Sequence, residues 1–190
     1  MTGLHHRDIG TLGACLFRPE VDCEVICDDL HISLEMVRLY FKVKDMSRFM
    51  MISDSGVYAG APIGKYKGMT SDEASDRIKI TVNEQGFVLS ETGRLSGSSK
   101  PVIYGIKNLV ERLEIPLEKV ILMSSLNPAK KYGYGETKGS LVEGKDADFA
   151  VITDGYDVVE TYSEGDCVFN IEIDKDTFNP VFIEKYKLAE

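Results

Sequence analysis

The feature that most restricts the fold is a run of four apolar residues, Phe49–Ile52, with polar residues on both sides. Such a run is typical of a strand buried on both faces, as in a parallel sheet. Val21–Cys27 predicts another strand. Ser33–Lys44 predicts an amphipathic helix between the two, with Ser33 as its N-cap. Strand, helix and strand within about 35 residues predict a βαβ unit with a parallel pair.

Asp54 directly follows the second strand, which we expect to end at Ser53, and it precedes a segment rich in glycine, Ser55–Met69, that predicts a loop. Enzymes of the α/β class place catalytic groups where a buried parallel strand opens into a loop. Asp54 is therefore a candidate catalytic residue. The alternative is that Asp54 only caps the loop.

Composition restricts the partners of the chain. The 190 residues have a net charge of −9 and an isoelectric point near 4.9. This balance argues against nucleic acid, because phosphate backbones are bound by basic surfaces. No apolar run approaches the roughly 20 residues of a membrane span, and the N-terminus has no signal-peptide pattern. We therefore expect a cytoplasmic protein of one to one and a half domains.

The cysteines raise the alternative of a zinc site. Cys23 and Cys27 are followed by His31, but no second pair comes at zinc-finger spacing. Residues 23, 25 and 27 would also share one face of a strand. We interpret the four cysteines as structural thiols in a reducing compartment.

The remaining chain predicts a hairpin at Arg77–Ser90, further helices and a β-rich end. A proline in the first turn is typical of helices, and Pro116 stands at such a position. The other expected elements are a loop with a glycine-rich turn over 1–20, helices over Lys100–Leu113 and Pro116–Leu126, a short helix from Asn127, and strands over Ala147–Ile152, Val158–Tyr162 and Cys167–Ile171.

Five segments carry residues typical of binding sites. They are Gly3–Gly10 (GLHHRDIG), Cys27–His31 (CDDLH), Ile52–Gly56 (ISDSG), Gly93–Ser98 (GRLSGS), and Asn127–Lys130 (NPAK) taken with Lys138–Asp148 (KGSLVEGKDAD). Each segment alone is more often structural. In this order, over about residues 1–170, they resemble the C-terminal half of N-acetylglucosamine-6-phosphate deacetylases, in the metal-dependent amidohydrolase superfamily.

The resemblance implies an α/β fold, namely the C-terminal portion of a (β/α)8 TIM barrel with part of a small β-sandwich. We expect residues 1–138 to form the partial barrel, 139–172 the sandwich segment and 173–190 a C-terminal extension. The implied reaction is hydrolysis of N-acetylglucosamine 6-phosphate to glucosamine 6-phosphate and acetate.

The resemblance also implies roles for individual residues. Asp54 matches the catalytic aspartate that moves a proton between water and the leaving amine. His31 matches a residue that contacts the sugar, and Arg7 a phosphate-binding arginine supplied by the neighbouring subunit of a dimer. The residues that match the substrate-contacting loop are Leu95, Ser96, Gly97 and Ser98.

The family's metal, zinc or iron, is held by a glutamate and two histidines that the resemblance places before Met1. His5 and His6 do not match these ligands. We therefore expect the chain alone to be inactive, and to dimerise or pair with an N-terminal half. A non-catalytic sugar-phosphate-binding or assembly subunit, or another amidohydrolase such as a deaminase or cyclic-amide hydrolase, is the alternative. Whether the chain is a natural product, half of a split gene or a fragment stays open.

Overall fold

The computed structural model describes residues 2–68, 79–174 and 187–188. The chain divides into two compact units. The first unit contains residues 1–52 and 102–170, and the second contains residues 53–101 and 171–190. In the described part of the chain, no helix is long and apolar enough to cross a membrane.

The first unit is built on the expected βαβ motif, so that prediction is confirmed. Strands β1 (Cys23–Ile26) and β2 (Phe49–Ile52) pair in parallel, and α2 (Leu34–Val43) connects them, followed by a 3-10 turn, η1 (Met46–Arg48). Ser33 is the N-cap of α2, and its hydroxyl accepts a hydrogen bond from the backbone N–H of Met36 at 3.4 Å.

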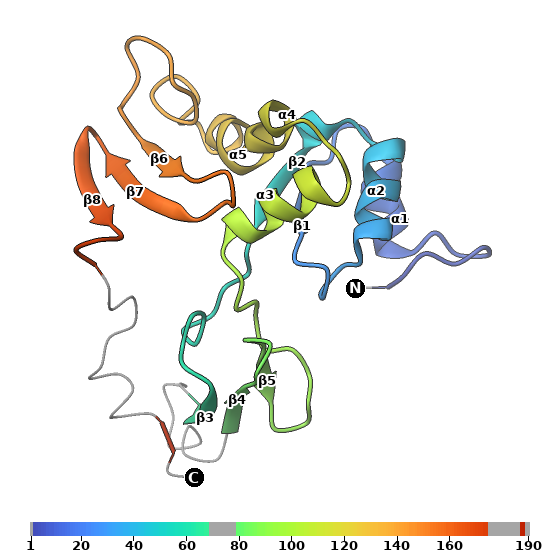
Figure 1. The fold of residues 1–190 in the computed structure, drawn as a ribbon. Helices are drawn as coiled ribbons and strands as arrows, with labels where there is room; N and C mark the ends of the chain where they lie inside the picture. The colour runs from blue at the N-terminus through green and yellow to red at the C-terminus, as the bar shows by residue number, and fades with distance from the viewer. Residues whose placement is uncertain (1, 69–78, 175–186, 189–190) are drawn as a thin grey trace. The chain divides into compact units, whose positions relative to one another are not determined.

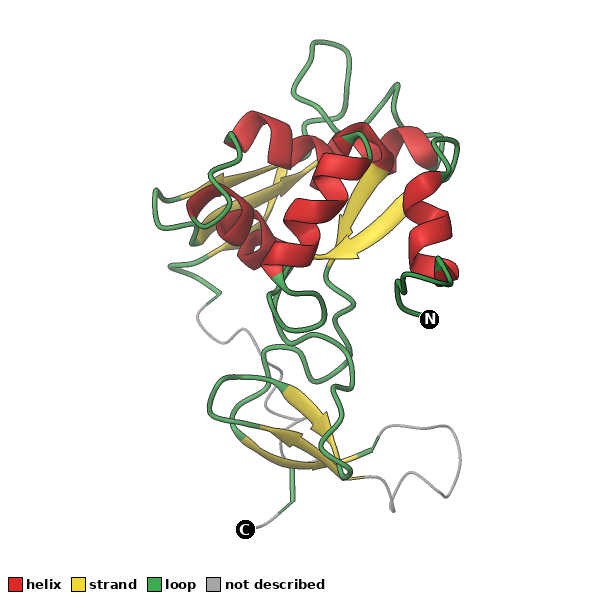
Figure 2. Ribbon diagram, turned by 90° about the vertical axis from the view of Figure 1, so that its right-hand side faces the viewer, coloured by secondary structure: helices red, strands yellow, loops and turns green. Residues whose placement is uncertain are grey.

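Helices cover this pair of strands (Figures 1 and 2). The predicted helix over 100–113 is α3 (Val102–Glu111), whose Leu109 is fully buried. A Cβ on Gly105 would lie 3.0 Å from Sδ of Met51 and 3.2 Å from Cβ of Cys27, so glycine allows α3 to pack closely on the strands. The apolar core joins the two strands to the helices, and its buried members are Leu16, Val25, Cys27, Leu34, Val37, Tyr40, Phe49, Met51, Ile106, Leu109, Val120 and Met123.

The second predicted helix is interrupted. It consists of α4 (Leu117–Ile121) and a π-helical turn, η3 (Leu122–Leu126). The short helix predicted from Asn127 is confirmed as α5 (Asn127–Lys131). The Asn127 side chain holds this end of the helix in place. Its Nδ2 donates to the carbonyl oxygens of Met46 at 3.1 Å and Phe49 at 2.8 Å, which attaches the helix to the start of β2.

The prediction of a loop over residues 1–20 is wrong, because Gly10–Phe17 forms helix α1. Two tertiary features stabilise this helix despite its glycines. Leu16 is buried in the core. The buried Lys44 ammonium donates to the carbonyl oxygens of Cys15 at 2.9 Å and Arg18 at 2.6 Å, which satisfies the last turn of α1.

The first unit ends in the predicted meander, a three-stranded antiparallel sheet of β6 (Phe149–Ile152), β7 (Val158–Ser163) and β8 (Asp166–Asn170). The Phe149 and Tyr162 rings stack at 4.5 Å between β6 and β7. Nearby, Lys138 pairs with Asp146 at 2.8 Å and Asp148 at 2.7 Å, so the KGSLVEGKDAD segment closes on itself through ion pairs.

The second unit contains the predicted hairpin, β4 (Lys79–Val82) and β5 (Val88–Ser90), which pair antiparallel. Residues 77 and 78 of that prediction lie outside the described residues, as does most of the extension over 173–190. The prediction of a continuous loop over 55–69 is wrong, because β3 (Gly64–Lys67) pairs with β4. The fully buried Tyr66 fixes β3 over a small core, and its hydroxyl donates to the Pro62 carbonyl at 2.6 Å.

Candidate functional site

The loop after β1 carries a histidine held by a buried carboxylate. Asp28 Oδ2 lies 2.8 Å from Nδ1 of His31, and the Asp28 side chain is 4% exposed. Asp28 Oδ1 accepts the backbone N–H groups of Leu30 and His31, each at 3.0 Å. Both carboxylate oxygens are therefore used to shape the loop and to orient the ring.

These hydrogen bonds determine the charge of Asp28. Burial by itself raises the pKa of this carboxyl, but the hydrogen bonds from the ring and backbone of His31 and from the backbone of Leu30 outweigh it. The resulting pKa lies below its ordinary value of 3.8. Asp28 is therefore ionised at neutral pH and can only accept hydrogen bonds.

Contacts with α3 and with Arg112, which directly follows it, hold the same loop in place. Asp29 has a left-handed backbone (φ 64°), and its carboxylate accepts from the Leu34 N–H at 3.0 Å and pairs with Arg112 at 2.7 Å. The buried Asn108 donates from Nδ2 to the Cys27 carbonyl at 2.9 Å. The position of His31 is thus set by several independent contacts.

In the second unit, Asp54 belongs to a strained and tightly packed turn. Asp54 is exposed, and its φ of 51° is an uncommon conformation for a residue with a side chain. Its carbonyl oxygen accepts the backbone N–H of Ser98 at 2.8 Å, and an isolated parallel bridge joins Ser55 to Ser98. A residue with a side chain keeps this conformation only where the surrounding structure holds it.

Gly97 makes this turn possible. Its φ is +80°, and a Cβ there would lie 3.0 Å from the Asp54 carbonyl oxygen and 3.3 Å from the Gly56 nitrogen. The structure thus brings Gly97 and Ser98 directly against the backbone of Asp54. Ser98 is buried and accepts the Lys100 N–H at 3.1 Å, whereas Leu95 and Ser96 are exposed.

Arg7 lies in an exposed turn of the first unit. His5 and Asp8 exchange backbone hydrogen bonds of 3.0 Å across this turn, and the His5 and His6 rings are 4.1 Å apart. Among the described residues, no group of three or more His, Cys, Asp or Glu side chains could hold a metal ion. Cys27 is buried, and burial raises its pKa to about 12, which makes its thiol a poor nucleophile.

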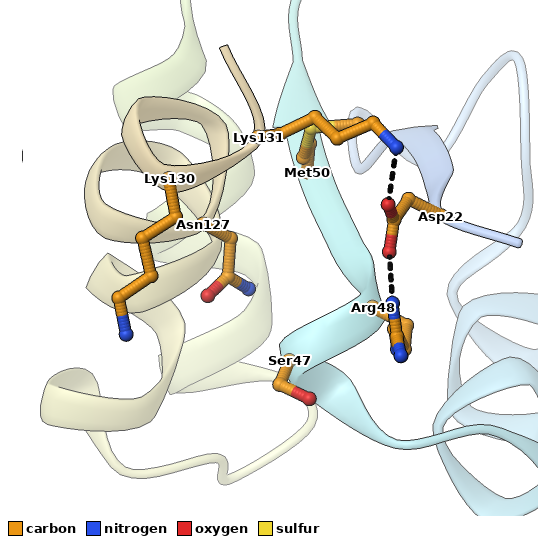
Figure 3. Close-up of a pocket in the computed structure, with 7 residues that line it drawn as sticks. All are labelled: Asp22, Ser47, Arg48, Met50, Asn127, Lys130 and Lys131. Carbon is orange, nitrogen blue, oxygen red and sulfur yellow. Dashed lines mark hydrogen bonds and ion pairs between the residues drawn. The ribbon is translucent and has the colours of Figure 1, made fainter. Parts of the chain in front are cut away.

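A pocket of about 250 Å³ opens at the amino-terminal ends of β1 and β2 (Figure 3). Asp22 pairs with Lys131 at 2.6 Å and with Arg48 at 3.0 Å. The hydrogen bond from Lys131, and to a smaller extent that from Arg48, lowers the pKa of Asp22. Asn127 and Lys130 also line it. Active sites of parallel α/β folds lie at the carboxyl ends of the strands, and this pocket lies at the opposite end.

The sequence made His31, Asp54 and the loop over 95–98 candidates and included Asp28 and Asp29 in the segment Cys27–His31 without giving them a role, and it did not point to Asn108. The i, i+3 spacing of Asp28 and His31 within one short loop was the available signal. Nothing in the local sequence pointed to Asn108, because its contact with Cys27 joins residues 81 positions apart.

Comparison with known proteins identifies related chains. A model of the amidohydrolase family matches residues 42–179. N-acetylglucosamine-6-phosphate deacetylase of Vibrio furnissii is 33% identical over 170 residues, which is 90% of this chain and 40% of that protein. The crystal structure of N-acetylglucosamine-6-phosphate deacetylase from Thermotoga maritima is 32% identical with a TM-score of 0.75, over 89% of this chain and 44% of that one.

An Escherichia coli (strain K12) protein with the name "Putative N-acetylgalactosamine-6-phosphate deacetylase" is 31% identical over 87% of this chain and 93% of its own length. The chain thus spans about 40% of the length of the Vibrio furnissii relative but nearly all of the Escherichia coli one.

Proposed function

Because this chain belongs to the amidohydrolase family, we propose that it takes part in the hydrolysis of N-acetylglucosamine 6-phosphate to glucosamine 6-phosphate and acetate. The observation that carries the proposal is the Asp54 turn. It presents an exposed carboxylate at the end of a buried parallel strand, held in a left-handed conformation by Gly97 and Ser98. The names of the relatives supply the substrate class.

In this proposal, Asp54 moves the proton. Its carboxylate accepts a proton from the water that attacks the acetyl carbonyl carbon, while a new C–O bond forms. It returns the proton to the amide nitrogen as the C–N bond breaks, so that acetate and the amine of the sugar phosphate are released. A carboxylate can do both because it is a base before the transfer and an acid after it.

The other proposed site residues bind the substrate. His31 contacts the sugar, and the guanidinium of Arg7 pairs with the 6-phosphate, for which its planar fork is suited. The loop of Leu95, Ser96, Gly97 and Ser98 contacts the substrate beside Asp54. A chain with a net charge of −9 needs such local positive charge to attract an anionic sugar.

We also propose the architecture in which these residues work. Residues 1–138 form the C-terminal portion of a (β/α)8 barrel, 139–172 a segment of a β-sandwich and 173–190 an extension. The parallel β1–β2 pair with its crossover helix is evidence for the barrel part of this proposal, and the β6–β8 meander is evidence for the sandwich part. The described residues do not supply a ligand set for zinc or iron.

Acetate release tests the function. The acetate-releasing form is whichever of two preparations shows activity: the chain by itself, or the chain assembled with a polypeptide that supplies the upstream segments of a relative. We expect release from N-acetylglucosamine 6-phosphate that depends on Asp54. N-acetylgalactosamine 6-phosphate should be tested in the same assay, because the names of two relatives contain this compound. If neither preparation releases acetate from either sugar phosphate, the proposed function is wrong.

Replacing Arg7 with alanine should raise KM for the 6-phosphorylated sugar about 10- to 100-fold and leave binding of the non-phosphorylated sugar nearly unchanged. A charge-assisted hydrogen bond contributes about 1.5–3 kcal/mol, which corresponds to this range. Steady-state kinetics measure the first sugar and calorimetry the second. Arg18→Ala, at another exposed arginine, is the matched control. Equal losses for both sugars would show that Arg7 does not bind the phosphate.

The chain should also associate, with itself or with a polypeptide that adds strands beside β1 and β2. In the described residues, β1 and β2 pair only with each other, and the large apolar side chain of Phe17 is 76% exposed. Unpaired parallel strands and exposed apolar surface both favour association. Sedimentation velocity at micromolar concentration measures this. A monodisperse monomer with a cooperative thermal transition would contradict the expectation.

A further inference from the structure

The Cys27–His31 loop contains a buried Asp–His pair, Asp28 and His31. The proposed function gives a role to His31 and none to Asp28. We infer that Asp28 is a positioning residue that fixes the tautomer of His31, so that Nδ1 donates to Asp28 and Nε2 is left to accept a hydrogen bond from a sugar hydroxyl. This inference rests on the proposed function only for naming a sugar hydroxyl as the partner of Nε2.

The geometry leaves little freedom to either partner. The side chains of Asp28 and His31 are 4% and 18% exposed, and Oδ2 and Nδ1 are 2.8 Å apart. The Asp28 carboxylate cannot rotate without losing the two backbone N–H groups of Leu30 and His31 on its other oxygen. The ring is therefore held at a defined angle on a loop that Asn108 and Arg112 attach to α3.

The chemistry of the pair selects one tautomer. An ionised carboxylate has no proton to donate, so the hydrogen in the contact must lie on Nδ1. The lowered pKa of Asp28 keeps it ionised at neutral pH. A neutral imidazole carries one N–H, so its Nε2 is then a bare acceptor. Within the residues that the structure describes, Nε2 has no hydrogen-bond partner.

Nitrogen-15 NMR of the purified 190-residue chain reads the tautomer without any need for activity. The sequence has three histidines, so His31→Gln assigns the His31 ring by loss of its signals. At a pH where the ring is neutral, we expect Nδ1 to be the protonated nitrogen in the unmodified chain. A bare Nδ1 there would overturn the inference, whatever the variants do.

Asp28→Asn should reverse the two nitrogens. The amide oxygen can still accept the two backbone N–H groups, which turns the amide NH2 toward Nδ1 and makes that nitrogen the acceptor. Nε2 then carries the proton. Asp29→Asn is the matched control, because Asp29 contacts Leu34 and Arg112 and asparagine tolerates its left-handed backbone. The control should keep the original tautomer; a reversal in both variants, or in neither, contradicts a specific role of Asp28.

Kinetics separate positioning from a merely structural role. In the acetate-releasing form, Asp28→Asn should raise KM about 5- to 150-fold, the range for leaving one buried hydrogen-bonding group unpaired, with kcat within a few-fold of its original value. A fall in kcat with unchanged KM would overturn the role in binding. Absence of acetate release in every form would refute the proposed function and leave the tautomer measurement standing.

Discussion

Asp54→Asn should lower kcat of the acetate-releasing form by about 100- to 10,000-fold and change KM little. This is the usual contribution of a general acid–base group, which acts in the transition state rather than in substrate binding. An amide of the same shape cannot accept the proton from water. Asparagine tolerates the left-handed backbone of residue 54 (φ 51°), so the turn against Ser98 should persist.

The test of Asp54 requires proof that only the carboxylate has changed. Thermal unfolding of Asp54→Asn should match that of the original chain. Asp154→Asn removes the same charge from the exposed turn between β6 and β7 and should retain full kcat. Activity of Asp54→Asn within a few-fold of the original would show that Asp54 only caps its loop, the alternative that the sequence left open.

Gly97→Ala should lower kcat by about 10-fold, because the added methyl group would displace the backbone of Asp54. A Cβ at residue 97 would lie 3.0 Å from the Asp54 carbonyl oxygen and 3.3 Å from the Gly56 nitrogen, and both are backbone atoms that cannot rotate away. Neighbours at these distances have to move by a few tenths of an ångström. A shift of about 1 Å in a reacting group can cost about 100-fold in rate, so we expect a smaller loss here. The left-handed φ of +80° adds about 1–2 kcal/mol of strain.

Gly93→Ala separates strain from displacement. Gly93 has nearly the same φ, +75°, but a Cβ there meets nothing within 4 Å. Both variants should lose free energy of unfolding, measured by denaturant titration, and Gly97→Ala should lose more because of its backbone contacts. Only Gly97→Ala should lose most of its kcat. Equal kinetic losses in the two variants would show that contact with Asp54 is not what requires glycine at position 97.

Local patterns were enough to predict elements whose residues lie close together in the sequence. The apolar run of β2, the helical spacing of α2 with its Ser33 cap and the alternation of β4 and β5 are all confirmed. Each depends on periodicity and capping, which are properties of neighbouring residues. Asp54 became a candidate for the same reason, because it directly follows a predicted strand, whereas His31 became one through the family resemblance of its segment.

Contacts between distant residues decided the rest. Helix α1 contains two glycines and gave no helical signal, but the ammonium of Lys44 closes its last turn from 29 residues away. Strand β3 forms because Tyr66 belongs to a buried core cluster with Ile80 and Val82 of its partner β4. Such contacts leave no trace in a local pattern, since each partner is satisfied only after the chain has folded.

For the candidate site, the sequence by itself determined which functional groups are present and that they follow strands. Only the tertiary structure decided how they are held. Asp28 orients His31 through both of its oxygens, Asn108 holds the loop from 81 residues away, and Gly97 packs on the carbonyl of Asp54. The physical reason is that hydrogen-bond direction and close packing depend on positions in space, whereas the sequence fixes only the chemical identity of the groups.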